Sequence, residues 1–411
     1  MVDTRRKRLG LIAFVTILTM TAPIGTDLYL PALPEMTEYF GTTSTVASLT
    51  VTLFFVFMAI GTLLLGAISD RFGRRPVLLA SVLTALAFSL ICAFAPNIEL
   101  LLAARSLQAF GCGGMMVMAT AIVRDSFEGR DLVKVLSVTH AMIIIAPILA
   151  PSVGALIVHY ADWRMTFVAL AGILTVSFLL SLLFRETLPA HKRTSRGPLR
   201  SIAQLAAEVR DVRFAMLILV GGFITSPFKA YLANASYIYI EGFGVSEPVF
   251  GLYFAVCAAA SVMGPALNLR VQSVPVTRVF AFGYAILFLC GALLMTVGVL
   301  HPVAFLLCFI PVSTLNALFR PYVSGIMLAM KSENIGAASA VMNFGFTVIG
   351  SLGMLFAALP WGSYIHGVSY NIFVFVGLSL VFWIISLKTG LLRFPPKAGA
   401  AAPEPRTAKN A

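Results

Sequence analysis

One ionisable side chain lies deep in the first apolar run of this sequence. Asp27 stands in the stretch TAPIGTDLYLPALPEM (residues 21–36), at the end of a run that begins at Leu9. At 1.5 Å per residue, Asp27 would lie roughly 27 Å from Leu9 and about 9 Å from the far end of a helix over 9–33. A carboxyl group at that depth can exchange a proton, because burial favours its neutral form and a nearby cation favours its ionised form. The alternative is a static polar pin or a helix cap near the membrane surface.

Three cations, Arg105, Lys229 and Arg320, are expected inside later apolar runs, with Arg105 at a depth similar to that of Asp27. A cation at the centre of a membrane helix costs roughly 2.5–3.5 kcal/mol unless its head group reaches the membrane surface, which is the alternative for each of them. Lys229 could pair with Asp27. Alternatively, Lys229 and Arg320 line a cavity that favours neutral or anionic substrates. Three cations against one acid argue against a strict preference for lipophilic cations.

Aromatic side chains on the same runs could form an apolar, adaptable wall around a ligand. Fewer than half of them are expected to do so, because most aromatic residues in a helix bundle serve packing. The candidates are Tyr29, Phe54, Phe228, Tyr231, Tyr237, Phe344 and Phe346. Among these we predict that Tyr29, Tyr231 and Phe344 line a substrate cavity together with Lys229 and Arg320.

The elements that must position these residues are membrane helices. Of the 411 residues, 59% are hydrophobic and 11% charged, which is a membrane-protein composition. The apolar runs are too long and too uniform for the strands of a barrel, so the predicted fold class is an all-α membrane protein with twelve transmembrane helices. The runs cover residues 9–33, 46–68, 77–95, 98–122, 133–158, 163–184, 214–240, 248–269, 279–300, 303–330, 336–359 and 368–390.

The net charge of +12 does not indicate nucleic-acid binding, because the charges are sorted by position. Basic residues occupy the termini and every second connection, including Arg5, Arg6, Lys7, Arg8, Arg71, Arg74, Arg75, Arg124, Arg130, Lys134, Arg185, Lys192, Arg193, Arg196, Arg200, Arg210, Arg213, Arg270, Arg278 and Lys331. The other connections carry Glu35, Glu38, Glu99, Asp162, Glu241 and Glu247, with Arg164 as the one basic residue near them. By the positive-inside rule, both termini and the 185–213 linker should be cytoplasmic.

A long polar stretch over 185–213 divides the runs six and six. We therefore predict two pseudo-symmetric six-helix bundles, over 1–184 and 214–390, joined by this linker and followed by a disordered cytoplasmic tail over 391–411. Leu199 to Val212 could form a basic amphipathic helix on the inner leaflet. The first run has no obvious cleavage site and should remain in the mature protein. The five cysteines fall inside the runs without metal spacing, so they are expected to be packing residues, and no metal site is predicted.

The stretch GAISDRFGRRP (residues 66–76) connects the second and third runs. Asp70 near a helix C-terminus faces the negative end of the helix dipole and needs compensation from Arg74 or from another helix. The alternative is a simple turn whose arginines hold the connection inside. The stretch resembles the loop signature G-x-x-x-D-R-x-G-R-R/K of the major facilitator superfamily, in which this loop is expected to stabilise one end-state of alternating access. The matching residues are Gly66, Asp70, Arg71, Gly73, Arg74 and Arg75.

Two further motifs resemble signatures of the same superfamily. RSLQAFGCGG (residues 105–114) is similar to R-x-x-Q-G, with Ala109 in place of glycine, and the resemblance gives Arg105 a part in proton transfer or in holding the acid of the first run. APILAPSVGA (residues 146–155) is similar to the antiporter signature G-P-x-x-G-G and contains Pro147, Pro151 and Gly154. Whatever its function, this segment should be a kinked helix packed closely on a neighbour.

The stretches GTDLYLPALP, IVRDSFEGR, WRMTF and RETLP resemble the bicyclomycin and chloramphenicol resistance subfamily of drug:proton antiporters. The resemblance implies the major facilitator fold and a monomeric exporter of small amphipathic drugs in a bacterial inner membrane. Asp27 and Arg105 would then couple transport to protons, with the proton gradient as energy source and no cofactor. Its partners would be the small-molecule substrate, the proton and the lipid bilayer.

Other functions were weighed against this one. A proton-coupled metabolite exporter or symporter could use the same fold. A membrane enzyme is disfavoured, because no cluster has metal-ligand spacing and no nucleophile has a neighbouring base. A channel is disfavoured because no filter motif is present, and ATP coupling because G-x-x-x-x-G-K-[ST] is missing.

Overall fold

The computed structural model describes residues 2–194, 209–271, 273–330 and 335–391. Within these ranges every regular element is a helix. Twelve of the helical segments are long and apolar enough to cross a membrane, which confirms the predicted fold class. Lys331, most of the proposed linker helix over 199–212 and the tail from residue 392 lie outside the described residues.

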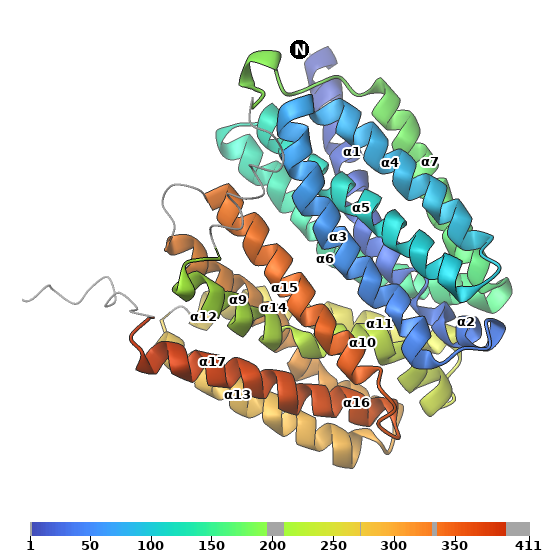
Figure 1. The fold of residues 1–411 in the computed structure, drawn as a ribbon, viewed down its shortest axis with the longest axis vertical. Helices are drawn as coiled ribbons and strands as arrows, with labels where there is room; N and C mark the ends of the chain where they lie inside the picture. The colour runs from blue at the N-terminus through green and yellow to red at the C-terminus, as the bar shows by residue number, and fades with distance from the viewer. Residues whose placement is uncertain (1, 195–208, 272, 331–334, 392–411) are drawn as a thin grey trace, which may run out of the picture.

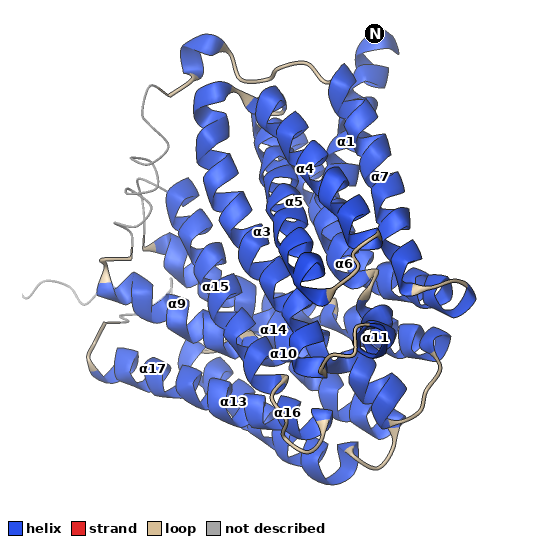
Figure 2. Cartoon of the chain, turned by 45° about the vertical axis from the view of Figure 1, so that its right-hand side comes forward, coloured by secondary structure: helices blue, strands red, loops and turns tan. Residues whose placement is uncertain are grey.

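The first six spans form one group of helices in which α5 contacts α1, α3 and α4 (Figures 1 and 2). Three of these helices begin at side-chain caps, where Thr43, Asn97 and Asp162 accept hydrogen bonds from main-chain N–H groups three residues later. The elements are α1 (Val2–Asp27), η1 (Leu30–Ala32), α2 (Leu33–Tyr39), α3 (Ser44–Phe72), α4 (Arg74–Ala93), α5 (Ile98–Ser126), α6 (Gly129–Tyr160) and α7 (Trp163–Leu183).

The first span differs from its prediction. Its α-helix ends at Asp27 rather than near residue 33, and the chain continues through η1 and α2 to Tyr39. Pro31 and Pro34 are the second residues of η1 and α2, within the first turn, where a missing N–H is tolerated. Asp27 therefore lies at a break between helices and not within a continuous helix.

The second six spans form another group, and several of them are interrupted. The seventh span breaks at Thr225 before Pro227, and the eighth breaks at Val262. The elements are α9 (Val212–Ile224), α10 (Ser226–Ser236), η3 (Tyr237–Gly242), α11 (Glu247–Ser261), α12 (Met263–Val271), α13 (Val276–Leu293), η4 (Leu294–Gly298), α14 (Pro302–Ala329), α15 (Ile335–Ala357), α16 (Tyr364–Asn371), η5 (Ile372–Val376) and α17 (Gly377–Lys388). A short turn, η2 (Ala190–Lys192), lies between the two groups in the chain.

The two groups are two bundles that meet at one end of the molecule (Figure 1). We call this the acidic end, defined by the connections 40–43, 94–97, 161–162 and 243–246. The opposite end carries the N-terminus, the turns at 73 and 127–128 and the connection after α7, and we call it the basic end. In Figure 1 the bundles diverge from α2, α11 and α16 toward this basic end.

Hydrogen bonds between the bundles are confined to the acidic half of the molecule. The Ser48 hydroxyl donates to the main-chain carbonyl of Ala233 over 3.2 Å, and the Ser152 hydroxyl to that of Gly251 over 3.1 Å. Two more contacts join Thr45 to the Ala358 carbonyl and Thr37 to the Tyr237 hydroxyl, the latter over 2.7 Å. Among the described residues, no hydrogen bond or ion pair joins the bundles in the basic half. The structure is therefore closed at the acidic end.

Candidate functional site

Asp27 is buried, with 4% of its surface exposed, at the C-terminus of α1. Among the described residues its carboxyl group has no hydrogen-bond or ion-pair partner. The carbonyl groups that end a helix carry partial negative charge, so this position does not compensate an ionised carboxylate. Burying an unpaired carboxylate costs several kcal/mol. This arrangement suits a group that is neutral while buried and ionised when water reaches it.

Helix α6 packs directly against the chain beside Asp27. A Cβ atom added at Gly154 would overlap the main-chain carbonyl of Leu28. Pro147 and Pro151 lie inside α6, which continues through both, and Ser152 on the same helix bonds to Gly251 of the second bundle. The close packing predicted for this motif is confirmed, and it places the α6 motif between the end of α1 and the second bundle.

Arg105 lies in an aromatic enclosure and is fully buried. Its guanidinium carbon is 4.0 Å from the ring centroid of Tyr29, 4.4 Å from that of Phe54 and 5.5 Å from that of Phe167. One terminal nitrogen donates to the Gly25 carbonyl over 3.1 Å and to the Gln108 side-chain oxygen over 2.5 Å. The alternative in which Arg105 extends to the membrane surface is therefore wrong.

The structure brings Arg105 to α1 without an ion pair to Asp27. The contact runs instead to the carbonyl of Gly25, two residues before the carboxyl group. The Nε and Nη2 atoms of Arg105 are buried and have no protein partner among the described residues. In this conformation Arg105 fixes the end of α1 and leaves the carboxyl group of Asp27 free.

Lys229 and Arg320 lie in the second bundle, and neither pairs with Asp27. The Lys229 ammonium donates to the Thr347 carbonyl over 3.0 Å and lies 4.4 Å from the ring centroid of Phe55 on α3. Arg320 on α14 donates to the side-chain oxygen of Asn343 on α15 over 3.4 Å. Lys229 is therefore held between the two bundles, where it contacts both.

The aromatic candidates differ in their surroundings. Tyr29 is buried against Arg105 and shares a hydrogen bond of 3.1 Å with Thr50. Phe344 is half-buried on α15. Tyr231 is 1% exposed and stacks on Phe309, with ring centroids 4.4 Å apart. In this conformation the Tyr231 ring belongs to the packed interior of the second bundle, and Tyr29 is equally buried, so neither ring is open to a cavity here.

Arg74 connects three helix ends at the basic end. It donates to Asp70 at the end of α3 over 2.6 Å and to Asp125 at the end of α5 over 2.9 Å. It also donates to the Ser69 hydroxyl over 2.7 Å. The expected compensation of Asp70 by Arg74 is thus present, and the guanidinium neutralises carboxylates at two helix C-termini.

Glu186, in the connection after α7, caps the N-terminus of α4. Its two oxygens accept the main-chain N–H groups of Arg74 over 2.9 Å and Arg75 over 3.1 Å, which have no partners within their helix. Gly73 precedes them with φ of 103°, and a Cβ there would meet the Glu186 carboxylate. The glycine of the loop signature is thus required both by its backbone angle and by the space that the carboxylate occupies.

Sequence reasoning did not single out Asp125 or Glu186. Both stand in stretches that carry the family resemblance, IVRDSFEGR and RETLP. A usable signal was present, because each carboxylate stands just past an apolar run on the same predicted side as the arginines of the loop. Of the other signature residues, Gly66 faces the side chain of Val117 on α5. Arg71 makes no ion pair among the described residues, and its guanidinium carbon lies 5.3 Å from the ring centroid of Phe72.

We expect Glu186→Gln to weaken this basic-end network by about 1–2 kcal/mol, since an amide nitrogen would face the N–H of Arg75 and the charge of Arg193. Burial alone would raise the pKa of Glu186. The N–H donors of Leu188, Arg74 and Arg75 and the charge of Arg193 lower it by more, so the pKa of Glu186 lies below its ordinary value. Ionised Glu186 therefore contributes fully to the free energy of unfolding above pH 4.5, the ordinary pKa of glutamate. This contribution is lost as the pH falls through the lowered pKa of the folded protein. Thermal unfolding of detergent-solubilised protein should show a difference between variant and wild type at pH 7 that shrinks toward pH 3. A constant difference at all pH values would contradict this assignment.

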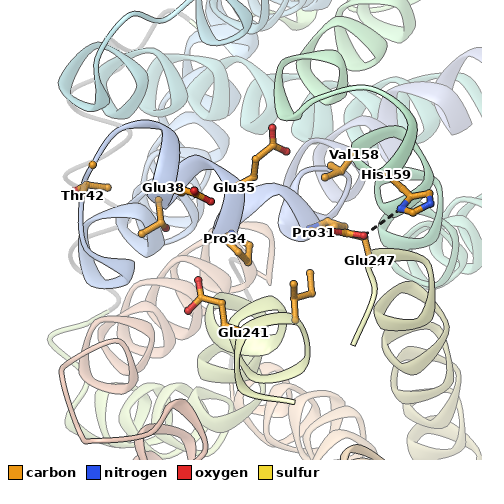
Figure 3. A pocket seen from close by; sticks show the side chains of 12 residues that line it. Pro31, Pro34, Glu35, Glu38, Thr42, Val158, His159, Glu241 and Glu247 are labelled. Carbon is orange, nitrogen blue, oxygen red and sulfur yellow. Dashed lines mark hydrogen bonds and ion pairs between the residues drawn. The ribbon is translucent and has the colours of Figure 1, made fainter. Parts of the chain in front are cut away.

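A pocket of about 650 Å³ lies at the acidic end, between the bundles (Figure 3). Its carboxylates are Glu35, Glu38, Glu241 and Glu247. Nδ1 of His159 on α6 lies 3.3 Å from a carboxylate oxygen of Glu247 on α11, in the other bundle. The contact is an ion pair when the imidazole is protonated. No group of metal-binding side chains occurs among the described residues.

Comparison with known proteins identifies the family. Residues 15–354 match the Major Facilitator Superfamily. An uncharacterized MFS-type transporter, YdgK of Bacillus subtilis (strain 168), is 31% identical over 85% of this chain and 88% of its own length. A bicyclomycin resistance protein homolog of Haemophilus influenzae is 29% identical over 82% and 84%, and a chloramphenicol resistance protein of Pseudomonas aeruginosa 33% over 62% and 61%.

The fold is also found in solved transporters. A bacterial homolog of the human lysosomal transporter Spinster, in an inward-facing and unoccupied conformation, matches with a TM-score of 0.73 at 15% identity, over 95% of this chain and 99% of that one. A D-xylose-proton symporter matches with a TM-score of 0.70 at 14% identity, over 91% and 97%. The chain is a transporter and not an enzyme, and it belongs to the major facilitator superfamily.

Proposed function

We propose that this protein exports small amphipathic compounds, including drugs, from a bacterial cytoplasm in exchange for protons. The observation that carries the proposal is Asp27, a buried carboxyl group without a partner at a break in the first span. Relatives named for chloramphenicol and bicyclomycin resistance support the drug class. The α6 motif, which resembles the antiporter signature, supports export over import.

In the proposed cycle the basic end faces the cytoplasm, as the charge distribution predicts. The conformation described here, closed at the acidic end and with Asp27 buried, precedes substrate uptake. Asp27 loses its proton when water reaches it from the basic end, and the protein then takes up substrate from the cytoplasm or inner leaflet. The bundles rock to open the acidic end, Asp27 takes a proton as the substrate leaves, and the return step releases that proton inside. One proton crossing 100 mV supplies about 2.3 kcal/mol, and no cofactor is needed.

Proteoliposomes that contain a pH-sensitive dye test the direction of coupling. When chloramphenicol or another substrate is added outside, an antiporter moves protons out of the lumen as substrate enters, so the lumen becomes more alkaline. A symporter would acidify the lumen, and an uncoupled carrier would leave its pH unchanged. Either of the latter results, for compounds that accumulate in the liposomes, would reject the proposed exchange. Liposomes without protein provide the baseline.

A further inference from the structure

Lys229 and Arg320 are cations within membrane spans that lack a counter-charge. Among the described residues, no ion pair includes either side chain. Lys229 uses one of its three N–H groups on the Thr347 carbonyl, and Arg320 bonds to the neutral amide of Asn343. Most of the hydrogen-bonding capacity of both cations is therefore unused.

The two cations lie close together, since their acceptors Thr347 and Asn343 are four residues apart and therefore neighbours on α15. Like charges near one another are unfavourable where the dielectric constant is low. Arg74, by contrast, is compensated by Asp70 and Asp125. Arg105 has no carboxylate partner either, but its guanidinium is enclosed by three aromatic rings. Lys229 and Arg320 have no anion to balance them among the described residues.

Lys229 reaches the region between the bundles, and Arg320 bonds to α15, the helix that packs on α3 of the first bundle. The Lys229 ammonium contacts the Phe55 ring of the first bundle, and its alkyl chain lies along Gly350 of α15. Arg320 lies roughly 14 Å from the basic end of α14, too deep for an arginine to face hydrocarbon without a large cost. It is nevertheless exposed, as is its partner Asn343. An exposed arginine and amide at this depth require a polar, water-accessible surface.

We propose that Lys229, Arg320 and Asn343 bind the carboxylate of an amphipathic anionic substrate, a refinement that rests on the proposed export function. The guanidinium offers parallel N–H donors that match a carboxylate, and the ammonium adds a second positive charge from another helix. The ring of Phe55, against which the Lys229 ammonium lies, supplies apolar surface for the body of the same molecule. A cationic substrate would meet two like charges at this site.

Three ligands with the same ring system and different charge test the proposal: naphthylacetate, naphthylacetamide and naphthylethylammonium. Binding to the purified full-length protein is measured by calorimetry, without transport. We expect naphthylacetate to bind roughly tenfold or more tightly than the amide, and the ammonium compound to bind weakest. Lys229→Gln and Arg320→Gln should each remove most of the preference for the carboxylate, while Lys229→Arg should keep it. Arg278→Gln, which removes an exposed cation at the start of α13, is the matched control.

Two results would overturn the anion site. One is equal or tighter binding of the ammonium compound by the wild-type protein. The other is an equal loss of all three ligands in the Gln variants, which would assign the cations a structural role. Because binding is measured without a proton gradient, a carboxylate preference in a protein that fails the proteoliposome test would reject the exchange and keep the site. Proton exchange with substrates that bind without a preference for the carboxylate would keep the proposed exchange and reject the anion site.

Discussion

Replacing Asp27 by Asn is expected to abolish proton-driven transport and to leave the protein folded. Asparagine has the same shape but cannot exchange a proton, so substrate entry into proteoliposomes should no longer change the pH of the lumen. Because the carboxyl group has no partner among the described residues, the substitution breaks no bond seen in the structure. The unfolding temperature should stay the same or rise, since the variant no longer buries an unpaired ionisable group.

The matched control is Asp131→Asn, which makes the same chemical change at the basic end. Asp131 is exposed and pairs with Arg8 over 3.3 Å, a surface contact that contributes roughly 0–1 kcal/mol. This variant should keep the pH response. If Asp27→Asn retained the response and instead unfolded at a lower temperature, Asp27 would be a structural pin and the proposed role would be wrong.

Arg105→Lys should reduce both stability and transport, although it preserves the charge. Lysine cannot lie flat between the rings of Tyr29 and Phe54 while also donating to Gly25 and Gln108. The loss of stacking and of one charged hydrogen bond should destabilise the protein by about 2–4 kcal/mol. Transport should fall because the end of α1 that carries Asp27 is no longer held. Thermal unfolding and the proteoliposome assay measure the two effects.

Arg164 offers a close comparison for this change. Its guanidinium also lies over two rings, 4.4 Å from those of Tyr39 and Trp163, but it is only half-buried at the acidic end. Arg164→Lys should therefore cost less than about 1 kcal/mol, within the range of exposed cation–π contacts. Equal losses of stability in the two lysine variants would show that the burial of Arg105 has no special consequence.

Hydropathy was sufficient to predict the spans and the fold class, because a membrane helix must be apolar along its whole length. The loop signature was equally informative, since Asp70 and Arg74 are four residues apart and meet locally at 2.6 Å. Local patterns of this kind determine their own geometry.

Contacts between distant segments could not be predicted in the same way. Arg105 and Asp27 were expected at a similar depth in their spans, but only packing decides that the guanidinium bonds to Gly25. Likewise, no local pattern distinguishes Tyr231, stacked on Phe309, from an aromatic side chain that faces a substrate. Whether an aromatic ring packs in the interior or faces a substrate depends on how the surrounding helices are arranged, which the local sequence does not specify.

Two of the hydrogen bonds that close the acidic end share a form that has an evolutionary consequence. Ser48 and Thr45 in the first bundle donate to the main-chain carbonyls of Ala233 and Ala358 in the second. Each such bond contributes only about 0.5–1.5 kcal/mol net, because water can replace it when the bundles part. The acceptors belong to the backbone, so substitutions at Ala233 or Ala358 do not remove them. The side chains at these two positions of the second bundle can thus change while the hydrogen bonds to their backbone are kept.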